Sequence, residues 1–167
     1  MIQKKVCMLG SFAVGKTSLV KRFVSSIFSE EYLTTVGVKV DKRLVKVNET
    51  EVNLMLWDLH GEDEFQKLRL SYLRGMSGYI LVVDGTRKTT LDRAFALQRN
   101  TEATFGPMPF ILVLNKADLK QEWQIPDDVL EGLRAKGWLI KKTSALTGEG
   151  VPEIFESLTE RILIEAT

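Results

Sequence analysis

The sequence of 167 residues has a single cysteine, Cys7, and it has no long hydrophobic run. One cysteine cannot form a disulfide within the chain, which excludes the class of small disulfide-stabilised domains. No apolar run approaches the roughly 20 residues that a membrane-spanning helix needs, and the apolar part of the N-terminal segment is too short for a signal peptide. We therefore expect a soluble, cytoplasmic protein in which Cys7 is an inert core thiol.

An excess of charge is also missing, because 23 basic residues stand against 22 acidic ones and the formal net charge is +1. This balance favours neither nucleic acid nor an anionic membrane surface as a partner. Prenylation would need a cysteine near the end of the chain, which reads Ile164-Glu165-Ala166-Thr167, and Ile2 stands where N-myristoylation needs glycine. We therefore expect no nucleic-acid partner and no lipid anchor on this chain.

Internal repeats and flexible linkers are absent as well, so residues 1–167 are expected to form one domain with a full hydrophobic core. Short apolar runs, of which Tyr79–Val83 and Phe110–Leu114 are the clearest, alternate with helical patterns. Such runs are typical of parallel strands covered on both faces. The alternation predicts an α/β fold in which about five helices flank a six-stranded, mostly parallel sheet. A hairpin turn at Asn48–Glu51 predicts one antiparallel edge strand.

A glycine-rich motif, Gly10-Ser11-Phe12-Ala13-Val14-Gly15-Lys16-Thr17, follows the first predicted strand and opens the first predicted helix. It fits G-x-x-x-x-G-K-[ST] in the strand–loop–helix context where that pattern binds phosphates. Its backbone N–H groups would surround the phosphates, and Lys16 would reach the β- and γ-phosphates. The motif predicts a P-loop NTPase fold, with Mg²⁺ on the Thr17 hydroxyl. The expected phosphate contacts are Ala13, Val14, Gly15, Lys16, Thr17 and Ser18.

A second motif, Asn115-Lys116-Ala117-Asp118, follows the strand expected at Phe110–Leu114. A carboxylate at Asp118 can accept two hydrogen bonds from the N1–H and 2-amino groups of guanine, a donor pair that adenine lacks. Asn115 would connect this loop to its neighbours, and the stem of Lys116 would lie along the base. Ser144-Ala145-Leu146, after the last strand, could offer the Ala145 N–H to the guanine carbonyl. By itself the Asn-Lys-x-Asp motif also fits a solvated turn, but the phosphate loop upstream favours guanine binding.

The chain resembles the Ras superfamily of small GTPases over about residues 4–164, through its phosphate loop, its Asn-Lys-x-Asp motif and its Ser-Ala pair. Within that superfamily it is most similar to the Rab and Ran branches, through Thr34–Val38 and Trp57-Asp58. The resemblance implies a monomeric domain that binds GDP or GTP with Mg²⁺, hydrolyses GTP and changes shape with the nucleotide. Both a prokaryote-type relative and a GTPase domain cut from a longer protein fit this pattern.

The resemblance also implies two switch segments through which effector, exchange-factor and activating proteins would bind. In the first, residues 28–37, Phe28 would pack against the guanine, and Thr35 would bind Mg²⁺ and meet the γ-phosphate. In the second, Asp58-Leu59-His60-Gly61 fits D-x-x-G. Asp58 would hold the Mg²⁺ shell through water, and the Gly61 N–H would approach the γ-phosphate.

Two residues depart from the family pattern. Glu62 stands where most relatives carry the glutamine that orients the attacking water, and an ionised glutamate only accepts hydrogen bonds and would repel the γ-phosphate. Phe12 occupies a loop position that is usually small, where its ring could crowd an arginine finger from a partner. We therefore hypothesise slow intrinsic hydrolysis. Catalysis would then come from Glu62 acting as a base with a raised pKa, from His60, or from a partner.

These motifs fit three functions to different degrees. The first is a Mg²⁺-dependent GTPase switch with Lys16, Thr35, Gly61 and Glu62 as catalytic residues. The second is a binding module that signals by GTP or GDP occupancy and barely hydrolyses, an alternative that Glu62 and Phe12 keep open. The third is a nucleoside or metabolite kinase. Such kinases share the phosphate loop but lack the guanine motif that this chain carries, so this function is disfavoured.

Overall fold

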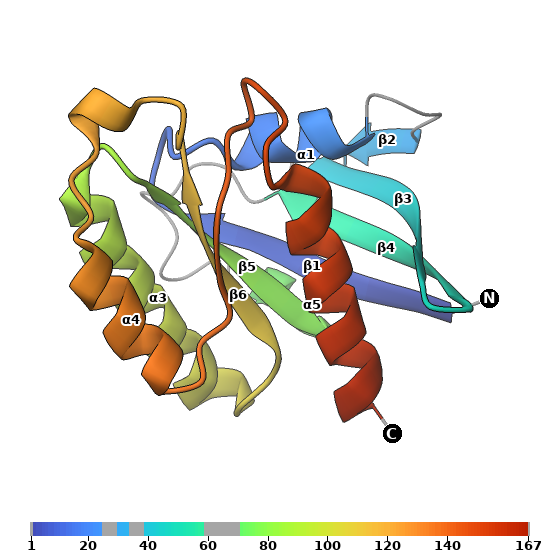
Figure 1. Cartoon of the computed structure of the whole chain (residues 1–167). Coiled ribbons are helices and arrows are strands. Elements are labelled where there is room, and N and C mark those ends of the chain that lie inside the picture. The colour runs from blue at the N-terminus through green and yellow to red at the C-terminus, as the bar shows by residue number, and fades with distance from the viewer. Residues whose placement is uncertain (1, 25–29, 34–38, 59–70, 167) are drawn as a thin grey trace.

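A twisted sheet runs through the middle of the molecule in the computed structural model (Figure 1). The structure describes residues 2–24, 30–33, 39–58 and 71–166, with the backbone alone at 30–33. The strand order is β2-β3-β4-β1-β5-β6-β7. The strands are β1 (Ile2–Gly10), β2 (Glu30–Leu33), β3 (Lys39–Val47), β4 (Thr50–Asp58), β5 (Gly78–Asp84), β6 (Phe110–Asn115) and β7 (Ile140–Lys142).

The six expected strands are present, and a short seventh strand, β2, extends the sheet beside β3. β1 pairs in parallel with β4 and β5, and the parallel arrangement continues through β6 and β7. The hairpin of β3 and β4 is antiparallel, as expected, and turns at Asn48, whose φ is +56°. β2 is also antiparallel to β3. It lies in the segment expected to form the first switch, where no hydrophobic alternation predicts a strand.

Helices cover both faces of the sheet because its central strands are apolar on both sides. Four α-helices lie within the described ranges: α1 (Lys16–Val24), α3 (Lys88–Phe105), α4 (Asp127–Ala135) and α5 (Val151–Glu165). In β1, Val6 and Met8 pack with α1 and α5, whereas Cys7 and Leu9 pack with α3 and α4. About five helices are expected, and residues 59–70, between β4 and β5, lie outside the described residues.

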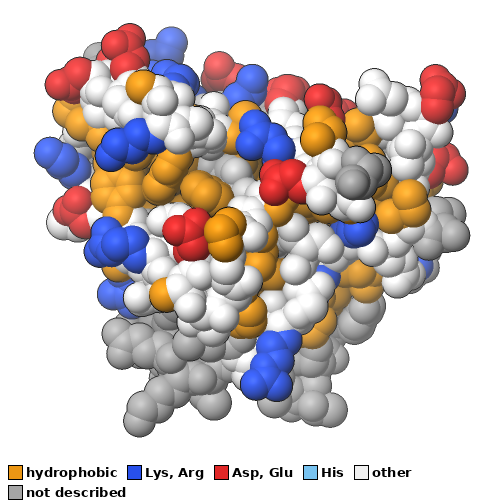
Figure 2. Space-filling model, turned by 90° about the horizontal axis from the view of Figure 1, so that it is seen from below, with side chains coloured by type: hydrophobic (Ala, Val, Ile, Leu, Met, Phe, Trp, Pro, Cys, Tyr) orange, Lys and Arg blue, Asp and Glu red, His pale blue; other side chains and the backbone are white. Residues whose placement is uncertain are grey.

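The loops at the carboxyl ends of the parallel strands form one edge of the molecule, at the top of Figure 1. In open α/β sheets this edge is where ligands bind. The opposite face carries basic and acidic side chains scattered among hydrophobic ones (Figure 2). In the part of the chain that the structure describes, none of the helices combines the length and apolar character needed to cross a bilayer.

Candidate functional site: a phosphate loop joined to a base-recognition loop

The loop after β1 closes around the ammonium group of Lys16. This side chain is buried, and its Nζ donates hydrogen bonds to the carbonyl oxygens of Gly10 at 2.7 Å and Ser11 at 3.3 Å. The loop takes left-handed backbone conformations at Ala13, where φ is +63°, and at Gly15, where φ is +106°. A Cβ at Gly10 would lie 2.5 Å from a carbonyl oxygen of β5. The motif glycines are therefore required by backbone conformation and close approach.

Two side chains from other elements hold carbonyl groups of the same loop. Asn115, at the end of β6, donates from Nδ2 to the Val14 carbonyl at 3.0 Å. Arg87, just before α3, donates from its guanidinium group to the Phe12 carbonyl at 2.8 Å. The C=O and N–H of one trans peptide group point in opposite directions, so a carbonyl held by a neighbouring element directs the next N–H away from that element. Such a row of N–H groups is suited to bind an anion.

Thr17 and Asp58 bring two oxygen ligands together beside the phosphate loop. The Thr17 Oγ1 donates to Oδ2 of Asp58 at 2.5 Å, and Asp58 is buried at the end of β4. Mg²⁺ prefers such oxygen ligands and usually takes only one or two from the protein, with water and substrate phosphates completing its shell. The pair therefore fits Mg²⁺. Across the described ranges no group of three or more His, Cys, Asp and Glu side chains could hold a metal by itself.

Asn115 connects three loops at the centre of the site. Besides holding the phosphate loop, it accepts hydrogen bonds at Oδ1 from the Thr143 hydroxyl and from the Ala145 N–H, both at 3.2 Å. A Cβ at Gly15 would lie 2.2 Å from the Asn115 Nδ2, so glycine is needed for this approach. The connecting role predicted for Asn115 is confirmed. The Ala145 N–H, predicted to serve a guanine carbonyl, supports Asn115 in this structure.

Asp118 is one of the residues that line a hollow of about 570 Å³. The Ser144 hydroxyl donates to Oδ1 of Asp118 at 2.7 Å and accepts the Thr147 N–H at 3.1 Å, which fixes the position of the carboxylate. The volume is in the range of a nucleoside-sized ligand site. The hollow is lined by Gly15, Ser18, Asn115, Lys116, Asp118, Leu119, Ala145 and Leu146. All of these except Leu119 are residues that the sequence predicts for nucleotide binding.

Asp84, at the end of β5, is a buried carboxylate that the sequence analysis missed. Its Oδ2 lies 2.9 Å from the Nζ of Lys116 and 3.0 Å from the Nε of Arg87, and its Oδ1 accepts the backbone N–H and the hydroxyl of Thr86. Burial by itself raises the pKa of Asp84, but the hydrogen bonds from Thr86, Lys116 and Arg87 outweigh it and lower the pKa from 3.8 to about 2. An ionised Asp84 therefore anchors Lys116 in the loop of residues 115–118, which we call the base-recognition loop after the base contacts that the sequence predicts for it.

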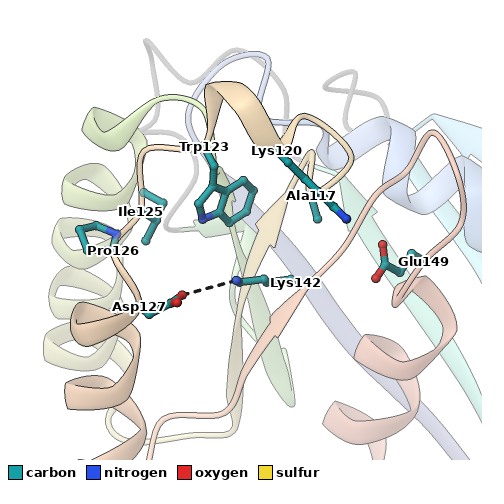
Figure 3. A pocket seen from close by; sticks show the side chains of 8 residues that line it. All are labelled: Ala117, Lys120, Trp123, Ile125, Pro126, Asp127, Lys142 and Glu149. Carbon is teal, nitrogen blue, oxygen red and sulfur yellow. Dashed lines mark ion pairs between the residues drawn. The ribbon is translucent and has the colours of Figure 1, made fainter.

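A second hollow, of about 480 Å³, lies behind the base-recognition loop, and Ala117 faces it (Figure 3). Trp123 forms part of its wall and packs so closely on Gly85 that a Cβ there would lie 1.9 Å from the indole ring. Lys142 lies over the same ring and pairs with Asp127 at 3.6 Å. Trp123 thus packs at the end of β5 beside the base-recognition loop. The hollow is lined by Ala117, Lys120, Trp123, Ile125, Pro126, Asp127, Lys142 and Glu149.

The structure places most of the predicted site residues along one edge of the sheet. Phe28, Thr35, Gly61 and Glu62 lie outside the described residues, as does His60. Of the residues that sequence reasoning missed, Asp84 had a usable signal, because it directly follows the apolar run of a central strand. Arg87 had none, since its partner in the phosphate loop lies 75 residues away.

Comparison with known proteins agrees with this geometry. A model of the Ras family matches residues 5–164. The chain is 35% identical over 163 residues to the Ras-related protein Rab-4 of Dictyostelium discoideum, a match that covers 95% of this chain and 78% of the relative. It is 34% identical over 161 residues to the Ras-related protein Rab-18 of Lymnaea stagnalis, with 95% and 80% covered. A zebrafish (Danio rerio) Rab-18-B is 32% identical, with 95% and 78% covered. The chain belongs to the Ras family of small GTPases.

Proposed function

We propose that this protein binds GDP and GTP, hydrolyses GTP to GDP and phosphate, and acts as a switch whose shape depends on the nucleotide. The observation that supports this best is the double connection of Asn115, which ties the phosphate loop to the base-recognition loop. A ligand with phosphates at one end and guanine at the other fits both loops at once.

Guanine selectivity is assigned to Asp118. Its carboxylate is held by the Ser144 hydroxyl at one oxygen, and it offers acceptors to the two donors on the guanine edge. With adenine these acceptors would meet no such donor pair, and a site built this way discriminates strongly against the wrong base. Lys116, anchored by Asp84 at 2.9 Å, places its aliphatic stem beside the base.

Phosphate binding is assigned to Lys16 and to the N–H groups of the loop around it. The Lys16 ammonium group would move from the loop carbonyls to the β- and γ-phosphates and offset the charge that develops during hydrolysis. Thr17 and Asp58 would hold Mg²⁺, which when bound neutralises charge on the phosphate oxygens. The N–H groups of Thr35 and Gly61 are expected to fix the γ-phosphate before water attacks it.

We infer that unassisted hydrolysis is slow because Glu62 replaces the water-orienting glutamine. Hydrolysis assisted by a partner meets a separate obstacle, since Phe12 is 73% exposed at the phosphate loop, where an arginine from the partner would have to pass. A module that signals by occupancy and barely hydrolyses is the alternative. Effectors, exchange factors and activating proteins are proposed to bind through the two switch segments of a monomeric, cytoplasmic protein.

Single-turnover hydrolysis of bound GTP, started by adding Mg²⁺, tests the proposal. A rate near or above the intrinsic value of ~10⁻⁴ s⁻¹ known for this class of enzyme would establish a GTPase that supplies its own catalytic groups. GTP that stays tightly bound and intact for hours would support the occupancy module instead. A protein that binds neither GTP nor GDP would refute both functions.

A further inference from the structure

Four carbonyl groups of the phosphate loop accept hydrogen bonds from three different side chains. Lys16 binds the carbonyls of Gly10 and Ser11 from within the loop. The Val14 carbonyl is bound by Asn115, which belongs to the guanine motif. The Phe12 carbonyl is bound by Arg87, which belongs to neither motif. The hydrogen bond from Arg87 to the Phe12 carbonyl therefore has no role in either motif.

The peptide that Arg87 holds is the one that most needs support. It joins Phe12 to Ala13, and Ala13 adopts a left-handed conformation with φ of +63° although it carries a Cβ. For a residue other than glycine, this conformation is unfavourable by roughly 1–3 kcal/mol and persists only where the surroundings enforce it. A cationic donor 2.8 Å from the Phe12 carbonyl oxygen supplies such enforcement from outside the loop.

The same contact also affects the N–H of that peptide. A charged donor on a carbonyl oxygen draws electrons through the amide, which makes the N–H of the peptide a stronger donor. Here that N–H is the one of Ala13, which the proposed function assigns to the phosphates. We propose that Arg87 is a positioning residue for the phosphate subsite, which orients and polarises the Ala13 N–H toward the β-phosphate of the bound nucleotide. This inference rests on the proposed function.

The arrangement around Arg87 requires arginine rather than any cation. Its Nε lies 3.0 Å from Oδ2 of Asp84 while another nitrogen of the same planar group reaches the Phe12 carbonyl. Asp84 is buried and fixed by Thr86 and Lys116, so it aims the guanidinium at the loop. A lysine has one nitrogen and cannot make both contacts with this fork geometry.

The contacts also connect the two halves of the nucleotide site. Asp84 binds Arg87 and Lys116 with the same oxygen atom. Loss of Arg87 can therefore act on the phosphates through Phe12 or on the base through Lys116. The route through Phe12 would weaken the binding of GDP but not of GMP, because GMP lacks the β-phosphate. The route through Lys116 would weaken both, because both carry the base.

The test measures GDP and GMP binding to the full chain by displacement of a fluorescent GDP, for wild type, Arg87→Ala, Arg87→Lys and Lys88→Ala. Lys88→Ala is the matched control, since it removes an exposed positive charge one residue further along. We expect Arg87→Ala to weaken GDP roughly tenfold or more, as for loss of a charged hydrogen bond, and to leave GMP within about twofold. Arg87→Lys should recover only part of the GDP affinity, and Lys88→Ala should change neither ligand.

A second measurement follows the Ala13 amide by NMR in the GDP complex. Loss of polarisation should move its proton signal upfield in Arg87→Ala but not in Lys88→Ala. Equal weakening of GDP and GMP would overturn the inference in favour of an action through Lys116, and an unchanged GDP affinity with an unchanged Ala13 signal would overturn it outright. Failure of the wild-type protein to bind GDP would instead refute the proposed function, so the two failures are distinguishable.

Discussion

Asp84 illustrates how a single buried carboxylate supports the site. Four hydrogen bonds from Thr86, Lys116 and Arg87 converge on its two oxygens. An isolated buried charge would be strongly unfavourable, but a fully bonded one stabilises the fold. Because the hydrogen bonds favour the ionised form, the lowered pKa of Asp84 makes its contribution to stability depend on pH.

We expect Asp84→Asn to lower the free energy of unfolding at pH 7 by about 2 kcal/mol. The folded pKa of about 2 lies below the ordinary value of 3.8, so the contribution is present above pH 4 and is lost as the pH falls from 3.8 toward 2. Urea unfolding at pH 7 and at several values below pH 4 would check this. A difference between wild type and variant that stays constant over this range would contradict the role given to the ionised carboxylate.

Glu62 is the residue expected to slow the hydrolysis of GTP. Replacement by glutamine removes a negative charge that would repel the γ-phosphate and restores a side chain that can both donate and accept. We expect Glu62→Gln to raise the single-turnover rate of GTP hydrolysis by tenfold or more, on the order of one charged interaction. Asp63→Asn, which removes the adjacent charge, serves as the control. An unchanged or lower rate in Glu62→Gln would show that repulsion is not what slows the reaction.

At the scale of elements, the site depends on how closely three loops approach one another. β5 ends at Asp84, and the indole of Trp123 packs against the next residue, Gly85. The N–H of Gly85 donates to the Asn115 carbonyl at 3.0 Å. The loop after β5 is thereby held between the base-recognition loop and the segment that precedes α4. This packing explains why a residue without a side chain follows Asp84.

Two glycine-to-alanine variants compare the close packing at Gly85 with an exposed glycine in a helix, Gly132. Gly85→Ala would put a Cβ 1.9 Å from the Trp123 ring, whereas a Cβ at Gly132 in α4 would meet nothing within 4 Å. We expect Gly85→Ala to destabilise the protein by about 2 kcal/mol or more. Gly132→Ala should stabilise it by up to about 1 kcal/mol, because alanine favours the helix. Thermal or urea unfolding measures both, and equal effects of the two changes would contradict the packing described for β5.

Asn115, in the guanine motif, connects the loops that follow β1, β6 and β7. Asn115→Ala would leave the Val14 carbonyl, the Thr143 hydroxyl and the Ala145 N–H without this partner. We expect a loss of about 3 kcal/mol in the free energy of unfolding, together with faster GDP release. Asn100→Ala on the exposed face of α3 is the control and should change neither quantity. A variant that keeps wild-type GDP release would argue against Asn115 as the connection between the loops.

The parts of the fold and site that the sequence predicts are those with local signals. Apolar runs predict the central strands, and the phosphate and guanine motifs each lie within eight residues or fewer, so their loops could be placed before any coordinates. β2 carried no such pattern, and its strand character depends on pairing with β3. The contact between Arg87 and Phe12 depends on the topology that brings β1 and β5 side by side, which short-range patterns do not contain.

At the scale of the whole molecule, two binding loops lie on one edge of the sheet. The sheet and the helices on both of its faces fix the distance between the phosphate loop and Asp118, while Asn115 and Asp84 connect the loops across that edge. A ligand must therefore satisfy both ends of the site. Selectivity for guanine therefore depends on both loops and on the contacts that connect them.

The most direct test is the affinity of the purified protein for GDP and for ADP, measured side by side with Mg²⁺ present. The two ligands share the phosphates and ribose and differ only in the base. We predict that GDP binds at least ~10³-fold more tightly, because Asp118 would meet no matching donor pair on adenine. GDP and ADP affinities within tenfold of each other would contradict the role of Asp118 and with it the proposed GTPase.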